Sequence, residues 1–184
     1  MESALLISGP PASGKSTVAS AVAARLRAAL LDQDVVTAAL TGVIGNLVGT
    51  QDLDDPRLAG LTRAARYEAV LATAVDTLRV GTPVVLVAPF TAERSDPAAW
   101  RVVRDRLRDA GGQPALVWLR LPADELVRRL RARGAERDEG KLADVAAFAA
   151  NTALLEPPAV EHIAVDGTAP LEHQLDAILS AALP

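Results

Sequence analysis

Near the amino terminus, eight consecutive residues have the types and spacing that bind a phosphate chain. They fit the pattern G-x-x-x-x-G-K-[ST], in which glycines let the backbone turn so that several N–H groups point at phosphate oxygens. In such a loop Lys15 reaches the β- and γ-phosphates, and the Ser16 hydroxyl ligates Mg²⁺. The residues expected to contact the phosphates are Gly9, Pro10, Pro11, Ala12, Ser13, Gly14, Lys15, Ser16 and Thr17.

The elements on both sides of this loop are the ones that must position it. Residues 4–8 form a short apolar run, typical of a buried parallel strand, and residues 17–26 favour a helix. The positive end of that helix faces the loop and favours the same anion. Strand, glycine loop and helix therefore come in the order that phosphate binding requires.

Along the rest of the chain, apolar segments alternate with helical stretches. This alternation predicts one α/β domain with a parallel sheet, spanning residues 1–184. The further strands are expected at 29–32, 83–88, 115–121 and 162–165, and the helices at 56–79, 97–110, 123–133 and 171–183. Asp55 and Pro56 are suited to the start of the first of these helices. Residues 41–50 are apolar but broken by glycines, which indicates either a flexible segment that closes over a ligand, or a surface loop or broken helix.

Composition excludes several classes of protein. The formal charge of −4 argues against a nucleic-acid-binding protein, for which a basic surface is expected. The absence of cysteine excludes disulfide scaffolds, thiol nucleophiles and cysteine zinc sites. No apolar run has the length of a membrane span, so no membrane association is expected and the default location is the cytoplasm.

The motifs that would mark other phosphate-loop proteins are missing. Neither lysine lies in the [NT]-K-x-D sequence that reads guanine, and no LSGGQ-like run marks a transporter ATPase. The third expected strand ends at Val87-Ala88-Pro89 without an acidic residue, whereas many such enzymes place a magnesium-associated aspartate there. A small kinase is the class that remains.

At this point the chain resembles the P-loop small-molecule kinases of the AAA-type ATP-binding family. This group includes gluconate kinase, chloramphenicol phosphotransferase and the zeta-toxin kinases. The resemblance is carried by residues 9–17, 31–34, 84–90 and 128–141. It implies a three-layer P-loop NTPase sandwich with sheet order 2-3-1-4-5, and ATP and Mg²⁺ as cofactors. It also implies an arginine-rich lid near 128–142 and an acceptor-binding insertion near 35–79.

Two carboxylates follow the second expected strand, at the sheet edge where α/β domains bind ligands. Asp32 and Asp34 are two residues apart, so on an extended segment they would point the same way. The resemblance implies that an acid here accepts the proton of the acceptor hydroxyl or serves Mg²⁺. We expect Asp34 to be the base and substrate contact, and Asp32 to join Ser16 on the metal side. The alternative is that either residue only caps the following helix.

Arginines are expected to contact the transferred phosphate and the nucleotide. Arg133 and Arg137 are the predicted catalytic arginines of the lid, and Arg129 and Arg133 share a helix face. An exposed helix face paired with Glu125 and other acids is an equally good interpretation for any one of them. Gly167 lies in a loop that resembles the adenine border of such kinases.

The predicted acceptor contacts come from the insertion and from the segment after strand three. In related kinases the insertion holds the acceptor, and an anionic or hydroxyl-rich acceptor would suit its arginines. The candidates are Asp34, Arg63, Arg66, Tyr67, Phe90 and Glu93. The plainer interpretation of the arginines is a solvated helix face.

Two functions of different classes follow from these features. The first is ATP-dependent phosphorylation of a hydroxyl on a small metabolite or antibiotic. The second, suggested by the missing strand-three acid, is a nucleotide-binding regulatory ATPase that acts through a protein partner. A nucleoside or nucleotide kinase is a weaker third possibility. The sequence leaves the acceptor and the oligomeric state open.

Overall fold

Five strands form one parallel sheet in the computed structural model, which describes residues 1–133 and 155–182. The order is β2-β3-β1-β4-β5, and each neighbouring pair is parallel, which confirms the expected topology. The strands are β1 (Glu2–Ser8), β2 (Ala29–Asp32), β3 (Val84–Val87), β4 (Gly112–Arg120) and β5 (Ile163–Asp166). β4 begins earlier than expected because residues from Gly112 onward pair with the start of β1.

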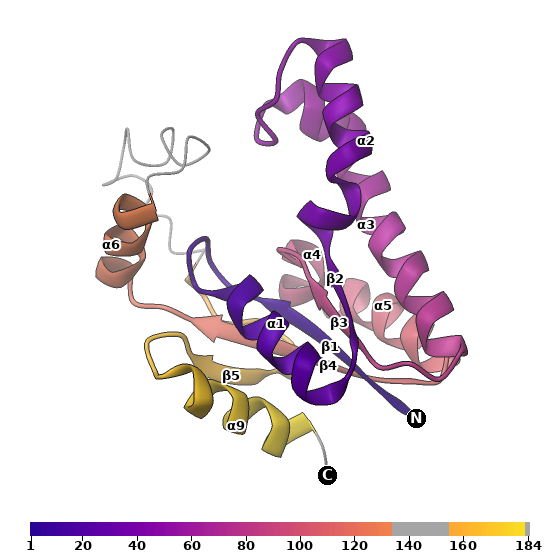
Figure 1. The fold of residues 1–184 in the computed structure, drawn as a ribbon, viewed down its shortest axis with the longest axis vertical. Coiled ribbons are helices and arrows are strands. Elements are labelled where there is room, and N and C mark those ends of the chain that lie inside the picture. The colour runs from indigo at the N-terminus through magenta and orange to yellow at the C-terminus, as the bar shows by residue number, and fades with distance from the viewer. Residues whose placement is uncertain (134–154, 183–184) are drawn as a thin grey trace.

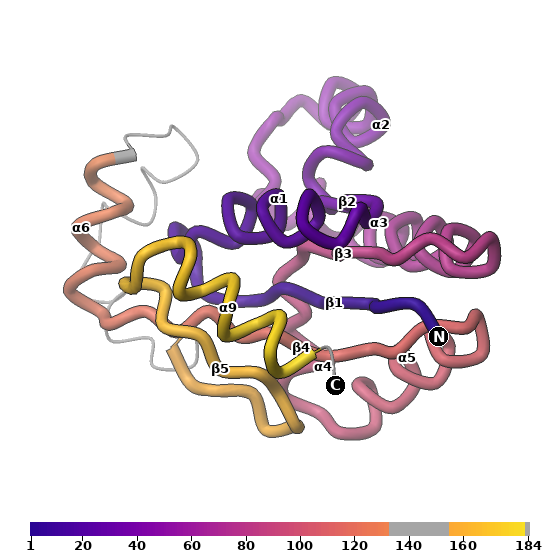
Figure 2. Tube along the Cα trace, turned by 60° about the horizontal axis from the view of Figure 1, so that its bottom comes forward, coloured from indigo at the N-terminus to yellow at the C-terminus, as the bar shows by residue number. Residues whose placement is uncertain are grey.

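Helices cover both faces of the sheet, which makes the three layers that were predicted (Figure 2). α1 (Lys15–Leu26) and α9 (Leu171–Ala182) cover one face, and α3 (Pro56–Arg79) and α5 (Pro97–Asp109) cover the other. Side chains of β1 alternate between these layers, as a two-residue strand period requires. Leu5 and Ile7 join the α1–α9 core, whereas Ala4 and Leu6 join the α3–α5 core.

Aspartate caps and proline at the first helical position start α3 and α5. The Asp55 side chain accepts a hydrogen bond from the Arg57 amide, and that of Asp96 accepts one from the Ala98 amide. These contacts satisfy N–H groups that have no partner inside the helix. The expected start of α3 is confirmed.

The second helix, α2 (Gln33–Val48), corrects two predictions. Residues 41–48 are helical rather than a loop, and the helix ends at Gly49, whose φ of 75° is the left-handed conformation that glycine adopts readily. Gly45 is required by packing, because a Cβ there would lie 2.5 Å from the Thr50 carbonyl oxygen. Asp34 lies in the first turn of α2, so it is not on the extended segment that was expected for Asp32 and Asp34.

The α2–α3 pair projects from the sheet as an arm, and α6 (Ala123–Arg133) stands on the other side of the phosphate loop (Figure 1). A short helix, α4 (Thr91–Ser95), follows β3. Of the helices in the described ranges, none combines the length and apolar character needed to cross a membrane.

Candidate nucleotide and acceptor site

The loop between β1 and α1 has the tight backbone that phosphate binding needs. A Cβ at Gly9 would lie 2.7 Å from the Ser13 hydroxyl oxygen and 2.8 Å from the Leu119 carbonyl oxygen. Gly14 caps the N-terminus of α1 with a φ of 95°, a conformation that is costly for residues with a side chain. Both glycines of the motif are therefore required by this fold.

Donors inside the loop are gathered where an oxyanion would lie. The Lys15 ammonium donates hydrogen bonds to the carbonyl oxygens of Gly9 (3.0 Å) and Pro10 (2.8 Å). The Ser13 hydroxyl is 1% exposed and has no hydrogen-bond partner within the part of the chain that the structure describes. A buried polar group without a partner is costly, and a phosphate oxygen would satisfy it. The loop therefore fits a polyphosphate.

Ser16 and Asp32 meet beside this loop. The Ser16 hydroxyl donates to Asp32 Oδ2 at 3.0 Å, and Asp32 Oδ1 accepts the Asp34 amide at 3.0 Å. Asp32 therefore caps α2 and also contacts the loop, so its role as a cap does not exclude the predicted role on the metal side. Oxygen donors of this kind suit Mg²⁺, which keeps several waters and is completed by phosphates. Among the described residues, no group of three or more His, Cys, Asp or Glu side chains could hold a metal ion by itself.

Asp34 points to a different partner. Its Oδ1 accepts a hydrogen bond from Arg66 Nη2 at 2.6 Å, and Arg66 Nε donates to the Thr37 hydroxyl at 2.9 Å. The Arg66 side chain is 14% exposed and that of Asp34 is 55% exposed. The arginine is thus fixed by α2, while the carboxylate remains accessible to a ligand.

Asp34 and Arg66 line a cavity of about 190 Å³ between α2 and α3. Thr41 and Gln51 add a hydroxyl and an amide to its wall, and the other lining residues are small or apolar. The complete lining is Asp34, Ala38, Thr41, Gly42, Gln51, Leu53, Leu58 and Arg66. A compact polar molecule would meet a cation, a carboxylate and neutral hydrogen-bonding groups here.

Four of the predicted acceptor residues, Arg63, Tyr67, Phe90 and Glu93, do not line this cavity. Phe90 is 1% exposed and belongs to the α3–α5 core, which argues against a direct ligand contact. Tyr67 packs edge-on against Phe90, with ring centroids 6.1 Å apart. Arg63 is exposed on α3 and does not line the cavity. Of the three predicted residues of α3, the structure brings only Arg66 to Asp34.

Burial raises two pKa values in the segment that follows β3. Burial and the nearby charge of Glu93 raise the pKa of Tyr67 to about 12, and burial raises the pKa of the Glu93 carboxyl. Burial therefore favours the neutral form of the Tyr67 hydroxyl and of the Glu93 carboxyl. Glu93 does not line the cavity, although it follows the strand whose expected acid is missing.

Arg129 joins α6 to the phosphate loop. Its guanidinium donates to the Gly167 carbonyl oxygen at 2.8 Å and to the Ser13 carbonyl oxygen at 3.5 Å, while Glu125 accepts its Nε–H at 2.6 Å. A Cβ at Gly167 would lie 3.2 Å from the Ser13 carbonyl oxygen, so glycine permits this close approach. The structure therefore brings the predicted nucleotide residues Arg129 and Gly167 together at the loop.

The structure describes only some of the other arginines of the predicted lid. Arg128 pairs with Glu125, as the alternative interpretation of this helix face expected, and these hydrogen bonds together with those from Arg129 lower the pKa of Glu125 to about 2. Arg133 is the last residue of α6. Arg137 lies outside the described residues.

The sequence analysis missed Thr37, Thr41 and Gln51. A signal was present, because Gln33, Thr37, Thr41 and Gly45 recur at four-residue spacing and form the buried side of α2. Arg94, the residue after Glu93, lies over the Trp118 ring, 5.0 Å from its centroid, and donates to the Glu156 carbonyl oxygen.

The glycine loop at the carboxyl edge of a 2-3-1-4-5 parallel sheet, with a lysine and a Ser–Asp pair, defines a P-loop nucleotide-binding domain. A family model described as an AAA domain matches residues 5–158. The chain belongs to this AAA domain family. No curated protein matches the sequence.

Solved structures with the same fold cover nearly the whole chain. A protein titled a putative kinase from Chloroflexus aurantiacus is 20% identical, with a TM-score of 0.68 over 100% of this chain and 99% of its own. A gluconokinase from Sinorhizobium meliloti is 20% identical, with a TM-score of 0.60 over 98% and 91%. The APS kinase of Mycobacterium tuberculosis, solved with AMPPNP and APS, is 18% identical, with a TM-score of 0.62 over 97% and 96%. At these identities the likeness shows the fold.

Proposed function

We propose that this protein transfers the γ-phosphoryl group of ATP to a hydroxyl of a small polar molecule. The observation that carries the proposal is the division of two neighbouring carboxylates. Asp32 hydrogen-bonds Ser16 of the phosphate loop, whereas Asp34 turns toward Arg66 and lines the cavity between α2 and α3. Phosphate-side and acceptor-side groups therefore lie next to each other where β2 leads into α2.

The reaction needs positioning and charge stabilisation more than covalent chemistry by the protein. An oxygen–phosphorus bond forms between the acceptor hydroxyl and the γ-phosphorus, and the β–γ bridging bond breaks, so that ADP leaves with the electron pair. Asp34 accepts the hydroxyl proton as the bond forms. Lys15, the Ser13 hydroxyl and the loop amides hold the phosphate oxygens. Ser16 and Asp32 would hold Mg²⁺, which supplies further charge neutralisation when it is bound.

The cavity indicates the kind of acceptor. Arg66 suits a carboxylate or another anionic group, and the Thr41 hydroxyl and Gln51 amide suit hydroxyl groups. The gluconokinase, shikimate kinase and APS kinase among the solved relatives are named for small anionic or hydroxyl-bearing molecules, which supports the same class here. A small hydroxylated acid is the acceptor class that this wall favours.

An ADP-release screen tests the proposal. Sugar acids, other hydroxylated acids, neutral polyols, aminoglycosides and nucleosides are offered to the wild type and to Asp34→Asn. A true acceptor raises turnover well above ATP hydrolysis by the enzyme alone, and Asp34→Asn lowers that stimulated rate by about 10²–10⁴-fold. Asp105→Asn, on the surface of α5, is the matched control and keeps the wild-type rate. If no acceptor stimulates turnover while ATP still binds, the transferase proposal fails.

One observation favours a second function. β3 ends at buried Val87 and is followed by buried Ala88, so no carboxylate stands at the position that many P-loop enzymes use for magnesium. A regulatory ATPase with slow turnover would tolerate this loss, and its ATP state would bind a protein partner. Light scattering with and without ATP, in the absence of any acceptor, distinguishes this function from the transferase.

A further inference from the structure

The α2 helix has its polar side buried and its apolar side exposed. Its buried residues are Gln33, Thr37, Thr41 and Gly45, and the helix packs on α3. Four aliphatic side chains point outward, which we call the α2 stripe: Val36, Leu40, Val43 and Leu47, with exposures of 41%, 75%, 57% and 82%. Apolar residues of a surface helix normally face the core, so this reversal marks the stripe as a candidate contact surface.

The spacing of the α2 stripe indicates what covers it. The residues follow one another at intervals of four, three and four, which is the seam that one helix presents to another helix in a coiled coil or bundle. Ala39 and Asn46 flank the seam with small or neutral side chains. In the described part of the chain, α3 covers only the polar side of α2. Among the described residues, the α2 stripe is therefore a helix face without a packing partner, and its spacing suits a second helix.

We propose that the α2 stripe of one molecule packs antiparallel against the α2 stripe of a second copy, forming a twofold dimer. A twofold axis near residues 41 and 42 would place Leu40 opposite Val43 of the second copy and Val36 opposite Leu47. The stripe is complementary to itself, as such an axis requires. Asp34 is the one charged residue in the sequence of α2, and it pairs with Arg66 away from the stripe. The face therefore carries no charge that would select a different protein.

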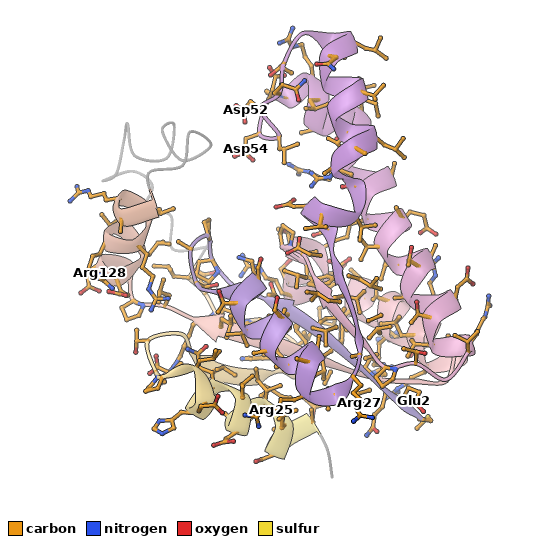
Figure 3. All side chains as sticks on the ribbon, in the orientation of Figure 1. Glu2, Arg25, Arg27, Asp52, Asp54 and Arg128 are labelled. Carbon is orange, nitrogen blue, oxygen red and sulfur yellow. The ribbon has the colours of Figure 1, made fainter. Side chains whose placement is uncertain are left out.

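A membrane is a poorer occupant of the same face. Interfacial helices usually flank their apolar side with lysine and arginine, which α2 lacks. Asp52 and Asp54 lie at the end of the arm beside α2, as Figure 3 shows, and an anionic bilayer would repel them.

The size of the face agrees with a small dimer interface. Each aliphatic side chain contributes on the order of 100 Å² when it is fully exposed. The four residues of the α2 stripe thus offer a few hundred Å² of apolar surface. A specific interface buries roughly 800 Å² per partner and is apolar mainly at its centre. The stripe is sufficient for that centre, with the polar residues of the arm as its rim.

Dimerisation would leave the cavity open. Ala38 and Gly42 line the cavity, and by helical geometry they lie on a different side of α2 from Leu40 and Leu47. The dimer is therefore independent of the acceptor, and its test does not depend on any activity.

Sedimentation velocity and light scattering at micromolar concentration test the proposal. The wild type is expected to have twice the monomer mass of 19.2 kDa. The double variant Leu40→Glu/Leu47→Glu is expected to have the monomer mass and an unchanged circular dichroism spectrum, because both side chains are exposed. Val102→Glu replaces an aliphatic residue on α5 that is 69% exposed, and this control stays dimeric.

Cross-linking gives a second measurement that does not depend on how a charged variant folds. The chain contains no cysteine, so Leu40→Cys/Val43→Cys introduces the only thiols. A short bifunctional maleimide is expected to link two copies of this variant, and not of Val102→Cys. A wild type that stays monomeric, a dimer that survives the glutamate pair, or monomer that co-floats with lipid vesicles through α2 would each overturn the proposal.

Discussion

At the scale of single residues, the site depends on how two nearby carboxylates acquire different partners. Asp32 ends a strand, so its side chain reaches back to Ser16 and also caps α2. Asp34 lies two residues later, inside the first turn, and its side chain meets Arg66 from α3. The start of a helix between the two residues therefore separates the phosphate loop from the proposed acceptor side.

Replacing Lys15 is expected to weaken ATP binding without unfolding the protein. A charge-assisted hydrogen bond contributes about 1.5–3 kcal/mol, so Lys15→Ala should raise the Kd for ATP by roughly 10–100-fold. Isothermal titration calorimetry in the presence of Mg²⁺ measures this change. Arg104→Ala removes a partly exposed cation of α5 that pairs with its neighbour Asp105, and this control keeps the wild-type Kd.

Changing Arg66 should affect the acceptor and not the nucleotide. A lysine keeps the charge but cannot donate to Asp34 and Thr37 in the same fixed geometry. We expect Arg66→Lys to lower kcat/KM for a stimulating acceptor by about 10–100-fold, while the Kd for ATP is unchanged. Arg63→Lys, on the exposed side of the same helix, should alter neither quantity. A parallel loss of ATP binding in Arg66→Lys would place this arginine on the nucleotide instead.

Glu93 predicts a pH dependence of stability. Burial raises the pKa of its carboxyl above the value in the unfolded chain, so the ionised form is disfavoured in the folded state. The resulting destabilisation is absent below the unfolded pKa of about 4.3 and develops as the pH rises through the folded pKa. Glu93→Gln should therefore have a higher Tm than the wild type at pH 7 and the same Tm at pH 4. Equal Tm values at both pH values would contradict the assignment.

At the scale of elements, local sequence signals and tertiary packing contribute differently. Asp55-Pro56 and Asp96-Pro97 specify helix starts locally, so the bounds of α3 and α5 could be predicted closely. Three glycines suggested a break near residues 41–50, but one of them, Gly45, is there because the Thr50 carbonyl oxygen packs against the helix. That contact depends on how the chain turns back after α2, which no local pattern reveals.

The same limit applies to the site. The phosphate loop is recognisable because its motif is contiguous, whereas the pairing of Asp34 with Arg66 joins residues that are 32 positions apart. Arg63, Arg66 and Tyr67 are equivalent by helical spacing. Only the angle between α2 and α3 decides that Arg66 meets the carboxylate and that Tyr67 turns toward Phe90.

Removing the cap of α5 should destabilise the fold by a predictable amount. The Asp96 carboxylate accepts the Ala98 amide, and loss of such a cap typically costs about 0.5–2 kcal/mol. Because a change of 1 kcal/mol shifts Tm by roughly 2–4 °C in a chain of this size, Asp96→Ala should lower Tm by about 1–8 °C. Asp105→Ala, in the middle of the same helix and exposed, should change the free energy of unfolding by less than about 0.5 kcal/mol. Thermal denaturation followed by circular dichroism compares the two variants.

At the scale of the whole molecule, the sheet order brings the carboxyl ends of three strands to the same edge of the sheet. β1 leads into the phosphate loop, β2 ends at Asp32, and β5 ends before Gly167, which Arg129 of α6 contacts. The α2–α3 arm and α6 stand on either side of that edge (Figure 1). A nucleotide bound there would contact elements from both halves of the sheet, so its binding should be coupled to global unfolding.

Magnesium and ATP together should therefore raise the melting temperature. A ligand at a concentration one hundred times its Kd adds about 2.7 kcal/mol to the free energy of unfolding, because it binds only the folded state. At roughly 2–4 °C per kcal/mol, the expected rise is about 5–10 °C. Adenosine, which lacks phosphates, should give no comparable rise, and Ser16→Ala should lose the part of the shift that depends on Mg²⁺. Dimerisation would also raise Tm as the protein concentration rises, so the scans are run at several protein concentrations. A rise in Tm without nucleotide at high protein concentration reports the dimer. No rise in Tm with MgATP at any protein concentration would rule out nucleotide binding by this loop.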